Sequence, residues 1–282
     1  MKPRIVRSVA SLRRETAAWR INSHRYALVP TMGALHDGHL TLVREALVRA
    51  DRVIATIFIN PKQFAANEDL GRYPRDEDGD VRKLARAGCH LIFAPPPDEM
   101  YRDGFATTVS LAGPAKAGLE DKFRPQFFDG VTTVVAKLFH AAEPDVAVFG
   151  QKDFQQLAII RRMVADLDMG VTIVPMPIVR EADGLAMSSR NRRLSAAQRA
   201  AAACVPRSLD AVAAAYDAGV RDVATLVAAG RRVVDAEPLA RFEHLEIVDG
   251  ATLRGDPTAG PGCVAVTAVW FGDVRLIDNR LL

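Results

Sequence analysis

A strand, a loop and the start of a helix follow one another in a single stretch, Ala27-Leu28-Val29-Pro30-Thr31-Met32-Gly33-Ala34-Leu35-His36-Asp37-Gly38-His39. The short apolar run at 27–29 predicts a buried strand, and the apolar residues of 40–47 then recur at the spacing of one helix face. The two histidines therefore fall where the loop leads into the helix. A strand that passes through a loop into a helix is the unit from which parallel α/β sheets are built.

The same alternation continues through the first half of the chain. Strands are predicted at 53–59, 89–93, 146–149 and 171–174, and helices at 76–87, 131–141 and 154–165. Strands joined by helical crossovers imply a parallel sheet, in which ligands bind where the carboxyl ends of strands lead into helices. We therefore expect the chemistry in the loops after Val29, Ile59 and Phe149.

After about Pro177 the pattern changes. A long Ala-rich helix is predicted at 194–218 and a second helix at 223–235, followed by strands at 242–248 and 263–270. Helices followed by strands are typical of an α+β domain. The sequence thus predicts an α/β domain over 1–178 and a smaller α+β domain over 179–282.

The composition is that of an ordinary globular protein. The 282 residues are enough for about two domains or one large α/β domain. Charged residues make up 25% and hydrophobic residues 49%, which excludes disordered, collagen-like and coiled-coil classes. The 37 basic and 34 acidic residues leave a formal charge of +3, so we expect no general field for binding nucleic acid or an anionic membrane.

The cysteines and the termini indicate a cytoplasmic protein. Cys89, Cys204 and Cys263 form no C-x-x-C pair, which excludes a zinc knuckle and argues against a disulfide framework. The N-terminus lacks the apolar core of a signal peptide, and Glu15 favours a plain first strand and helix over a transit peptide. The longest uncharged stretch, residues 257–272, is shorter than the ~20 residues of a membrane-spanning helix.

The loop before the first long helix is the first candidate for chemistry. His36 and His39 are spaced to face a phosphate together, and Gly38 allows a close approach to the backbone. The helix N-terminus adds unpaired N–H groups and the positive end of its dipole. The alternatives are a capping loop with two surface histidines and a metal-binding pair that lacks its third ligand.

Two further strand-to-helix junctions carry polar side chains. Asn60 and Gln63 follow the most apolar strand, and their amides suit a small ligand with hydroxyl and carboxylate groups. A turn whose amides only satisfy backbone groups is the alternative. After the strand at 146–149, Gly150 permits a tight turn, Lys152 places an ammonium on an oxyanion, and Gln156 lies about one turn into the next helix.

Two further segments fit either a binding role or a structural role. Ser188, Ser189 and Arg190 precede the Ala-rich helix and suit a mobile phosphate clamp, or equally a helix cap with a solvated arginine. The acidic run 76–80 is typical of a solvated first helical turn, and Asp80 is its one candidate Mg²⁺ ligand, since Mg²⁺ can be held mainly by substrate phosphates. Neither a P-loop nor a G-x-G-x-x-G fingerprint occurs.

Together these segments resemble the pantothenate synthetase family of the H-x-G-H nucleotidyltransferase superfamily. The resemblance covers essentially the whole chain, in the order and spacing of the family. Its segments are residues 29–39, 57–64, Tyr73-Pro74-Arg75, 130–135, 149–156, Ser188-Ser189-Arg190-Asn191 and 270–279.

The resemblance implies a Rossmann-like N-terminal domain that binds ATP and pantoate, a C-terminal lid, and a homodimer. It also implies that ATP, (R)-pantoate and β-alanine give pantothenate, AMP and pyrophosphate with Mg²⁺, through a pantoyl adenylate. Closure of the second domain would keep water from this intermediate.

The resemblance also implies roles for individual residues. His36, His39, Lys152 and Arg190 would act in catalysis, His39 as the proton donor, while Gln63 and Gln156 would bind pantoate, and Gln63 with Asn60 would contact β-alanine. ATP would be bound by Met32, Gly38, His39, Gly150, Gln151, Lys152, Asp153, Val179, Met187, Ser188, Ser189 and Arg190.

One departure from the family pattern is visible. Where the family commonly reads Arg-Pro-Gly-His-Phe, this chain has Arg124-Pro125-Gln126-Phe127-Phe128, so an imidazole is absent and a glycine is replaced. Two other functions stay open on the residues alone: another H-x-G-H nucleotidylyltransferase, or a non-catalytic nucleotide-binding module. The pair Gln63 and Gln156 argues against the first, because a phosphorylated substrate would call for a further cation.

Overall fold

The computed structural model describes residues 2–65 and 69–282. These fall into two compact units, the first comprising the chain up to Gln151 together with 156–177, and the second comprising Lys152–Gln155 with Ile178–Leu282. The sequence prediction put its boundary between 178 and 179. In the structure the second unit begins at Ile178 and also includes the short segment 152–155.

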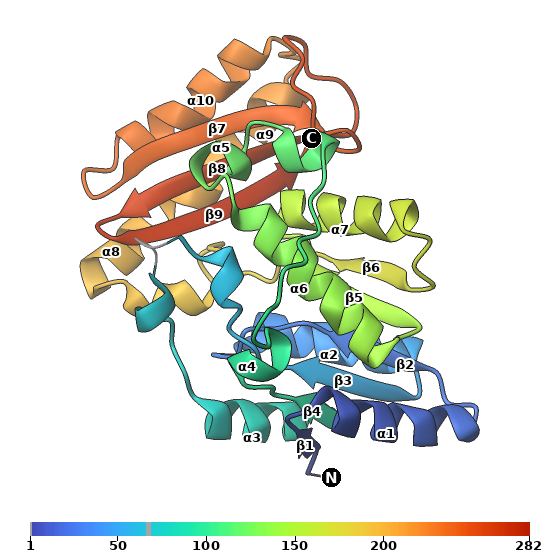
Figure 1. The fold of residues 1–282 in the computed structure, drawn as a ribbon. Coiled ribbons are helices and arrows are strands. Elements are labelled where there is room, and N and C mark those ends of the chain that lie inside the picture. Colours follow the sequence, from blue (N-terminus) through green and yellow to red (C-terminus); the bar gives the residue numbers. More distant parts are fainter. Residues whose placement is uncertain (1, 66–68) are drawn as a thin grey trace. The chain divides into compact units, whose positions relative to one another are not determined.

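The first unit is built on a parallel sheet of six strands in the order β1-β4-β3-β2-β5-β6 (Figure 1). This confirms the predicted parallel α/β sheet. The strands are β1 (Arg4–Val6), β2 (Tyr26–Val29), β3 (Arg52–Thr56), β4 (Leu91–Phe93), β5 (Val146–Gly150) and β6 (Thr172–Met176). The helices are α1 (Val9–Ile21), α2 (Asp37–Arg49), α3 (Glu77–Ala87), α4 (Pro97–Met100), α5 (Glu120–Phe123), α6 (Phe127–Ala142) and α7 (Phe154–Asp166), with 3₁₀ turns η1 (Pro61–Gln63), η2 (Asp69–Arg72) and η3 (Gly113–Lys116).

Both faces of the sheet are covered, because side chains alternate along each strand. In β2, Tyr26 and Leu28 join a core with α1, α6 and α7, while Ala27 and Val29 join a second core with α2 and α3. All four side chains are buried. A strand that is apolar on both faces is typical of the centre of a parallel sheet.

The strand order brings the expected site loops together at one edge. β2 pairs with β3 on one side and with β5 on the other, and all three strands run in the same direction. The loops after Val29, Thr56 and Gly150 therefore leave the sheet at neighbouring carboxyl ends, where α/β proteins bind ligands.

Most predicted elements of this unit are confirmed within a few residues. Helix α3 begins after its N-cap Asp76 and ends at Ala87, which confirms the helix predicted at 76–87. Its C-cap, Gly88, has a left-handed φ of 87°. The strand predicted at 53–59 is wrong in its second half, because β3 ends at Thr56. Beyond it, Phe58 N–H donates to the carbonyl of Thr31 and no longer to a strand neighbour.

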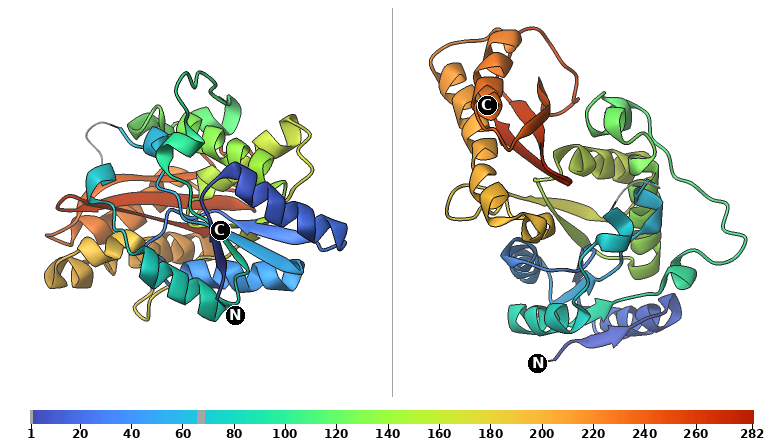
Figure 2. Two further views of the ribbon diagram at one scale, coloured as in Figure 1. Left: turned by 60° about the horizontal axis from the view of Figure 1, so that its bottom comes forward. Right: turned by 90° about the vertical axis from the view of Figure 1, so that its left-hand side faces the viewer.

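The second unit packs helices against one face of an antiparallel sheet in the order β7-β8-β9, which confirms the predicted α+β arrangement (Figure 2). Its strands are β7 (Arg241–Asp249), β8 (Cys263–Phe271) and β9 (Val274–Leu281). Its helices are α8 (Ala196–Ala201), α9 (Cys204–Asp217) and α10 (Val223–Asp235), preceded by the 3₁₀ turn η4 (Ser189–Arg193). None of the helices in the described part of the chain is long and apolar enough to cross a membrane.

The single helix predicted at 194–218 is wrong, since α8 ends at Ala201 and α9 begins at Cys204. Pro206 explains the break. It has no N–H to donate to the carbonyl four residues earlier, so a helix cannot run through it. In the first turn of α9 that missing donor has no consequence, because the first N–H groups of a helix have no partner within it.

The three strands of the second unit are joined by one carboxylate. Glu243 of β7 accepts hydrogen bonds from Nε1 of Trp270 on β8 at 2.6 Å and from Nε of Arg275 on β9 at 2.8 Å. Burial alone would raise the pKa of Glu243, but these hydrogen bonds, with His244 beside it, lower that pKa from 4.5 to about 2. The ionised carboxylate therefore stabilises this sheet.

We predict that Glu243→Gln lowers the free energy of unfolding by about 3 kcal/mol at neutral pH, the equivalent of the change in pKa. The glutamine keeps the shape but not the charge that Arg275 contacts. Because the pKa is lowered on folding, the contribution is full above pH 4.5 and is lost as the pH falls toward 2. Denaturant unfolding of the native protein and of Glu243→Gln, at pH 7 and at pH 2.5, measures the difference in their free energies of unfolding.

The matched control is Glu246→Gln, which removes an exposed carboxylate from the same strand. It should change the free energy of unfolding by less than ~0.5 kcal/mol. Equal effects of the two substitutions would contradict the role of Glu243.

Candidate active site

The loop between β2 and α2 is fixed first by a pair of threonines. Thr31 N–H donates to Oγ1 of Thr56 at 3.0 Å, and Thr31 Oγ1 donates to the carbonyl of Thr56 at 2.5 Å. Both residues are buried. The loop therefore leaves the sheet in a defined direction set by the end of β3.

A strained turn follows. Gly33 has a φ of 81° and Ala34 a φ of 51°, so two successive residues adopt the left-handed region. For alanine this conformation costs roughly 1–2 kcal/mol. The surrounding structure must offset that strain if the turn is to persist.

The carboxylate of Asp80 on α3 holds this turn. Its Oδ2 accepts the N–H of Ala34 at 2.7 Å, and its Oδ1 accepts the N–H of Leu35 at 2.8 Å. Lys83, one turn along the helix, donates from Nζ to the carbonyl of Leu35 at 2.9 Å. Three groups of the loop backbone are thus bonded to one face of α3.

Asp80, which the sequence suggested as a candidate Mg²⁺ ligand, therefore uses both of its oxygens to shape the loop. Its side chain is 1% exposed, and burial raises its pKa while the bonds from Leu35 and Ala34 lower it. Among residues 2–65 and 69–282 no three His, Cys, Asp or Glu side chains are grouped to hold a metal ion.

The two histidines lie together at the start of α2. His36 is the N-cap, and its N–H donates to Nδ1 of His39 at 3.3 Å. Their ring centroids are 4.1 Å apart. Because Nδ1 of His39 is an acceptor here, the proton of the neutral ring is on Nε2, which makes that atom the donor toward a ligand. Gly38 lies beside them in the first turn of the helix.

Asn60 and Gln63 form a second group of the first unit, in the turn η1. Asn60 is 1% exposed, and its Oδ1 accepts from the hydroxyl of Tyr101 at 2.7 Å and from Lys62 N–H at 3.3 Å. Its Nδ2 donates to Oε1 of Gln63 at 3.1 Å and to the carbonyl of Gly130 at 3.0 Å.

The Gln63 amide connects this turn to the loop. Its Nε2 donates to Sδ of Met32 at 3.2 Å. Ala34 also packs in one apolar cluster with Phe64 and Tyr73. The predicted ligand residues Met32 and Gln63 are thus in direct contact.

The end of β5 carries the remaining predicted residues of the first unit. Gly150 pairs with Met176 in the sheet, and Gln151 N–H donates to the carbonyl of Met176 at 2.8 Å. Gln156 lies in the first turn of α7 and is half-buried. Gly150 and Gln151 are therefore fixed by the edge strand β6.

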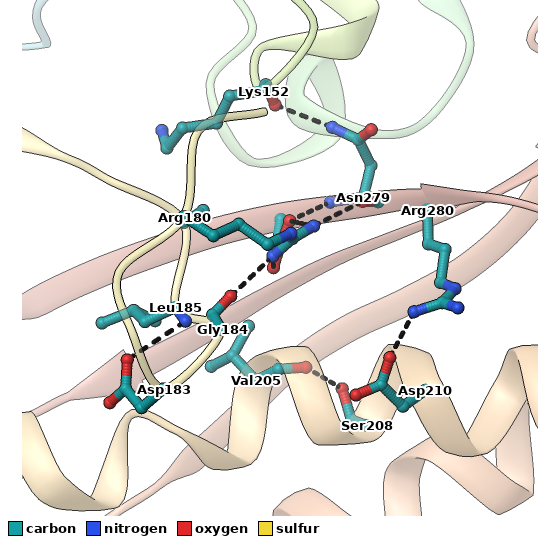
Figure 3. Close-up of polar contacts among 12 residues, drawn as sticks. Lys152, Arg180, Asp183, Gly184, Leu185, Val205, Ser208, Asp210, Asn279 and Arg280 are labelled. Carbon is teal, nitrogen blue, oxygen red and sulfur yellow. Dashed lines mark hydrogen bonds and ion pairs between the residues drawn. The ribbon is translucent and has the colours of Figure 1, made fainter. Parts of the chain in front are cut away.

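The other predicted residues belong to the second unit, where β9 anchors them. Asn279 of β9 donates from Nδ2 to the backbone carbonyl of Lys152 at 2.9 Å, as Figure 3 shows. Lys152 and the neighbouring Asp153 are half-buried. The backbone that presents the Lys152 ammonium is thus held by the last strand of the chain.

A short hairpin leads to Ser188, Ser189 and Arg190. Met187 N–H donates to the carbonyl of Val179 at 2.9 Å. Arg180 donates to the carbonyl of Gly184, as Figure 3 shows. The same guanidinium also donates to the buried carboxylate of Asp278 on β9.

The hairpin ends in the turn η4. There Ser188 Oγ accepts the N–H of Arg190 at 3.2 Å, while Ser189 is 5% exposed. The predicted clamp is therefore an ordered turn whose base is tied to β9.

Sequence reasoning missed the residues that hold these groups in place. Asp80 was considered only as a candidate Mg²⁺ ligand in a run more typical of a solvated helical turn, and no role was predicted for Lys83, Tyr101, Arg180 or Asn279. The one available signal was a pair of polar residues, Asp278-Asn279, in an otherwise alternating apolar strand. The partners of the others lie 41 to 98 residues away along the chain, which no local pattern reveals.

The comparisons with known proteins agree with one another. The family model described as "Pantoate-beta-alanine ligase" matches residues 4–281. The chain belongs to this family. A relative named "Pantothenate synthetase" from Nitrobacter winogradskyi is 52% identical, and one from Caulobacter vibrioides is 50% identical, each over 98% of both chains.

Solved structures of the pantoate-beta-alanine ligase family have the same fold. The crystal structure of pantothenate synthetase from Thermus thermophilus is 44% identical over 99% of both chains, with a TM-score of 0.93. The pantoate-beta-alanine ligase from Francisella tularensis, complexed with β-γ ATP and β-alanine, is 28% identical and has a TM-score of 0.81. It covers 99% of this chain and 97% of that one.

We predict that Asp80→Asn lowers the free energy of unfolding by about 1–3 kcal/mol, because the amide turns a donor toward one of two buried N–H groups. Asp78→Asn, an exposed change in the first turn of the same helix, is the control and should have an effect below ~0.5 kcal/mol. Thermal and denaturant unfolding measure both. A melting temperature of the native protein that rises with added Mg²⁺, and fails to do so in Asp80→Asn, would instead make Asp80 a metal ligand.

Proposed function

We propose that this chain is an ATP-dependent ligase that joins (R)-pantoate to β-alanine through an amide bond and releases AMP and pyrophosphate. The observation that carries this proposal is the match to the pantoate-beta-alanine ligase family over residues 4–281, with relatives named pantothenate synthetase at about 50% identity. The groups at the ends of β2, β3 and β5 suit that chemistry.

In the first step a pantoate carboxylate oxygen attacks the α-phosphorus of ATP, and pyrophosphate leaves. This reaction depends on positioning and charge stabilisation and needs no protein nucleophile. The start of α2 is suited to it, because the helix N-terminus and the Nε2–H of His39 supply donors for phosphate oxygens. His36 assists by fixing the ring of His39, and Met32 and Gly38 line the nucleotide.

Lys152 and Arg190 supply the positive charge in this proposal. An ammonium and a guanidinium neutralise the charge that develops on the equatorial oxygens and on pyrophosphate. A preorganised donor of this kind contributes roughly 3–4 kcal/mol in the transition state. The remaining predicted nucleotide residues, Gly150, Gln151, Asp153, Val179, Met187, Ser188 and Ser189, flank these two along the chain.

Gln63 and Gln156 bind the hydroxy acid. Neutral amides recognise hydroxyl and carboxylate oxygens without the charge that a phosphorylated substrate requires. In the second step the β-alanine amine attacks the acyl carbon of pantoyl adenylate, the amide C–N bond forms, and AMP leaves. The Francisella tularensis relative was solved with β-γ ATP and β-alanine, which supports those two substrates for this chain.

Mg²⁺ enters this proposal only with the nucleotide. Among the described residues no three His, Cys, Asp or Glu side chains are grouped to hold a metal ion, and we assign the ion to the phosphates of ATP, which often carry it with few protein ligands. We further propose that residues 1–178 form the catalytic domain and 179–282 the lid, and that the protein is a cytoplasmic homodimer, as the family resemblance implies.

The adenylation step is tested by pyrophosphate exchange into ATP without β-alanine. We expect exchange that depends on (R)-pantoate and is absent with phosphorylated alcohols. Hydroxylamine should trap the activated acyl group as a hydroxamate under the same conditions. Exchange that is indifferent to pantoate would overturn the proposal, and exchange with a phosphate ester would favour another nucleotidylyltransferase.

The charge of Lys152 is tested by Lys152→Ala. We expect kcat to fall by about 10²–10³, because an oxyanion donor is lost in the transition state, while ATP affinity stays within about tenfold. Lys116→Ala, which removes an exposed ammonium from the first unit, is the control and should leave kcat unchanged. Turnover above about a tenth of the native rate in Lys152→Ala would remove this residue from its role.

A further inference from the structure

The Asn60 side chain has no hydrogen-bonding group left for a ligand. A primary amide carries two donors, and those of Asn60 go to Gln63 Oε1 and to the carbonyl of Gly130. Its oxygen accepts from Tyr101 and from Lys62 N–H. Asn60, which the sequence suggested as a β-alanine ligand, is therefore placed to orient its neighbour.

The partners of Asn60 determine which way its amide points. The N–H of Lys62 can only donate, so it requires the amide oxygen, and the carbonyl of Gly130 can only accept, so it requires the NH₂ group. The hydroxyl of Tyr101 faces the same oxygen and must therefore donate. The alternative orientation would set like groups against each other at the two backbone contacts.

The orientation of Asn60 in turn fixes Gln63. Because Asn60 presents an N–H, the atom of Gln63 that faces it must be the oxygen Oε1. The NH₂ group of Gln63 then lies on the opposite side, against the sulfur of Met32. A thioether is a poor acceptor, so a ligand oxygen can replace it as the partner of this NH₂ group.

We propose that Tyr101 is a positioning residue: acting through Asn60, it holds the Gln63 amide with its NH₂ group toward the ligand, so that Gln63 recognises an oxygen acceptor of the hydroxy acid. This inference rests on the proposed function, since it names how one substrate is selected. It adds a residue 38 positions away from Gln63 that does not itself contact the ligand.

The surroundings of Tyr101 keep its hydroxyl protonated and its ring fixed. Burial raises the pKa of its hydroxyl far above its usual range, so the hydroxyl remains protonated. The ammonium of Lys62 lies 5.2 Å from its ring centroid and that of Lys137 lies 6.0 Å away, both on the ring face. Phe105 packs edge-on against the same ring, with centroids 5.1 Å apart.

Close packing against α6 brings the carbonyl of Gly130 within reach of Asn60. A Cβ at Gly130 would lie 2.2 Å from the carbonyl oxygen of Lys62, so only glycine permits this approach. The substitution of any larger residue at 130 would push the helix off the turn and remove the acceptor that sets the orientation of Asn60.

A separate contact, with Arg124, holds the Gln63 backbone. Arg124 Nη2 donates to the carbonyl of Gln63 at 3.1 Å, and the guanidinium lies 3.7 Å from the ring centroid of Phe127. The aromatic ring of Phe127 thus supports the arginine by stacking. Without the Tyr101 hydroxyl, Asn60 loses the shortest of its four hydrogen bonds and holds the Gln63 amide less firmly, while Arg124 keeps the Gln63 backbone in place.

The experiment compares Tyr101→Phe with the native protein in the ligase assay. We expect the KM for pantoate to rise about five- to tenfold, the loss of one net hydrogen bond, with the KM for ATP within twofold and the melting temperature nearly unchanged. In a Gln63→Ala background, Tyr101→Phe should have no further effect on the KM for pantoate, because the group it orients is gone. Additive effects, or equal rises in both KM values, would overturn the inference.

The control is Tyr26→Phe, which removes a hydroxyl bonded to the carbonyl of Ala142 at 3.0 Å and to Nε of Arg20 at 2.8 Å. It should lower stability and leave the KM for pantoate unchanged.

A second measurement needs neither substitution nor activity. In the native protein with labelled glutamine and methionine, the side-chain NH₂ of Gln63 should show a nuclear Overhauser contact to the Met32 methyl group. Its absence would contradict the proposed orientation. A native protein that shows this contact but no pantoate-dependent pyrophosphate exchange would refute the function and leave the orientation intact.

Discussion

Two hydrogen bonds to one buried carboxylate hold the shape of the histidine loop. Asp80 takes the N–H groups of Ala34 and Leu35, and without them the left-handed turn at 33–34 would relax toward an ordinary conformation. His36 and His39 follow that turn directly, so their positions depend on it. The strain is offset by hydrogen bonds from the loop to the helix α3.

The same arrangement recurs in both units, where residues proposed to bind a ligand are held in place by other residues. Asn60 orients Gln63, and Asn279 holds the backbone of Lys152. A catalytic side chain placed within about 0.5 Å needs such support, because its own rotamers are otherwise free. Rigid strands and helices supply it here, and the loops carry only the final groups.

The sequence predicted the sheet, most helices and the segments that carry the site, because these depend on local patterns. The apolar run that ends at Val29 and the helix predicted at 76–87 are both readable over a few residues. It could not predict the role of Asp80, whose partners lie 45 and 46 residues away, nor that of Tyr101. Strand β9 was also missed, since the buried Asp278 and Asn279 interrupt its apolar alternation. Contacts between residues that lie far apart in the sequence produce no periodic pattern in it.

The bond between Asn279 and Lys152 has a consequence for biosynthesis. Its two residues are 127 positions apart, and the Arg180–Asp278 pair spans 98. On the ribosome the parallel sheet can assemble as its strands emerge, since domains fold from the N-terminal side first. Lys152 and the hairpin before Ser188 must wait for β9. A nascent chain can therefore form its parallel sheet well before it fixes the residues proposed to bind the nucleotide.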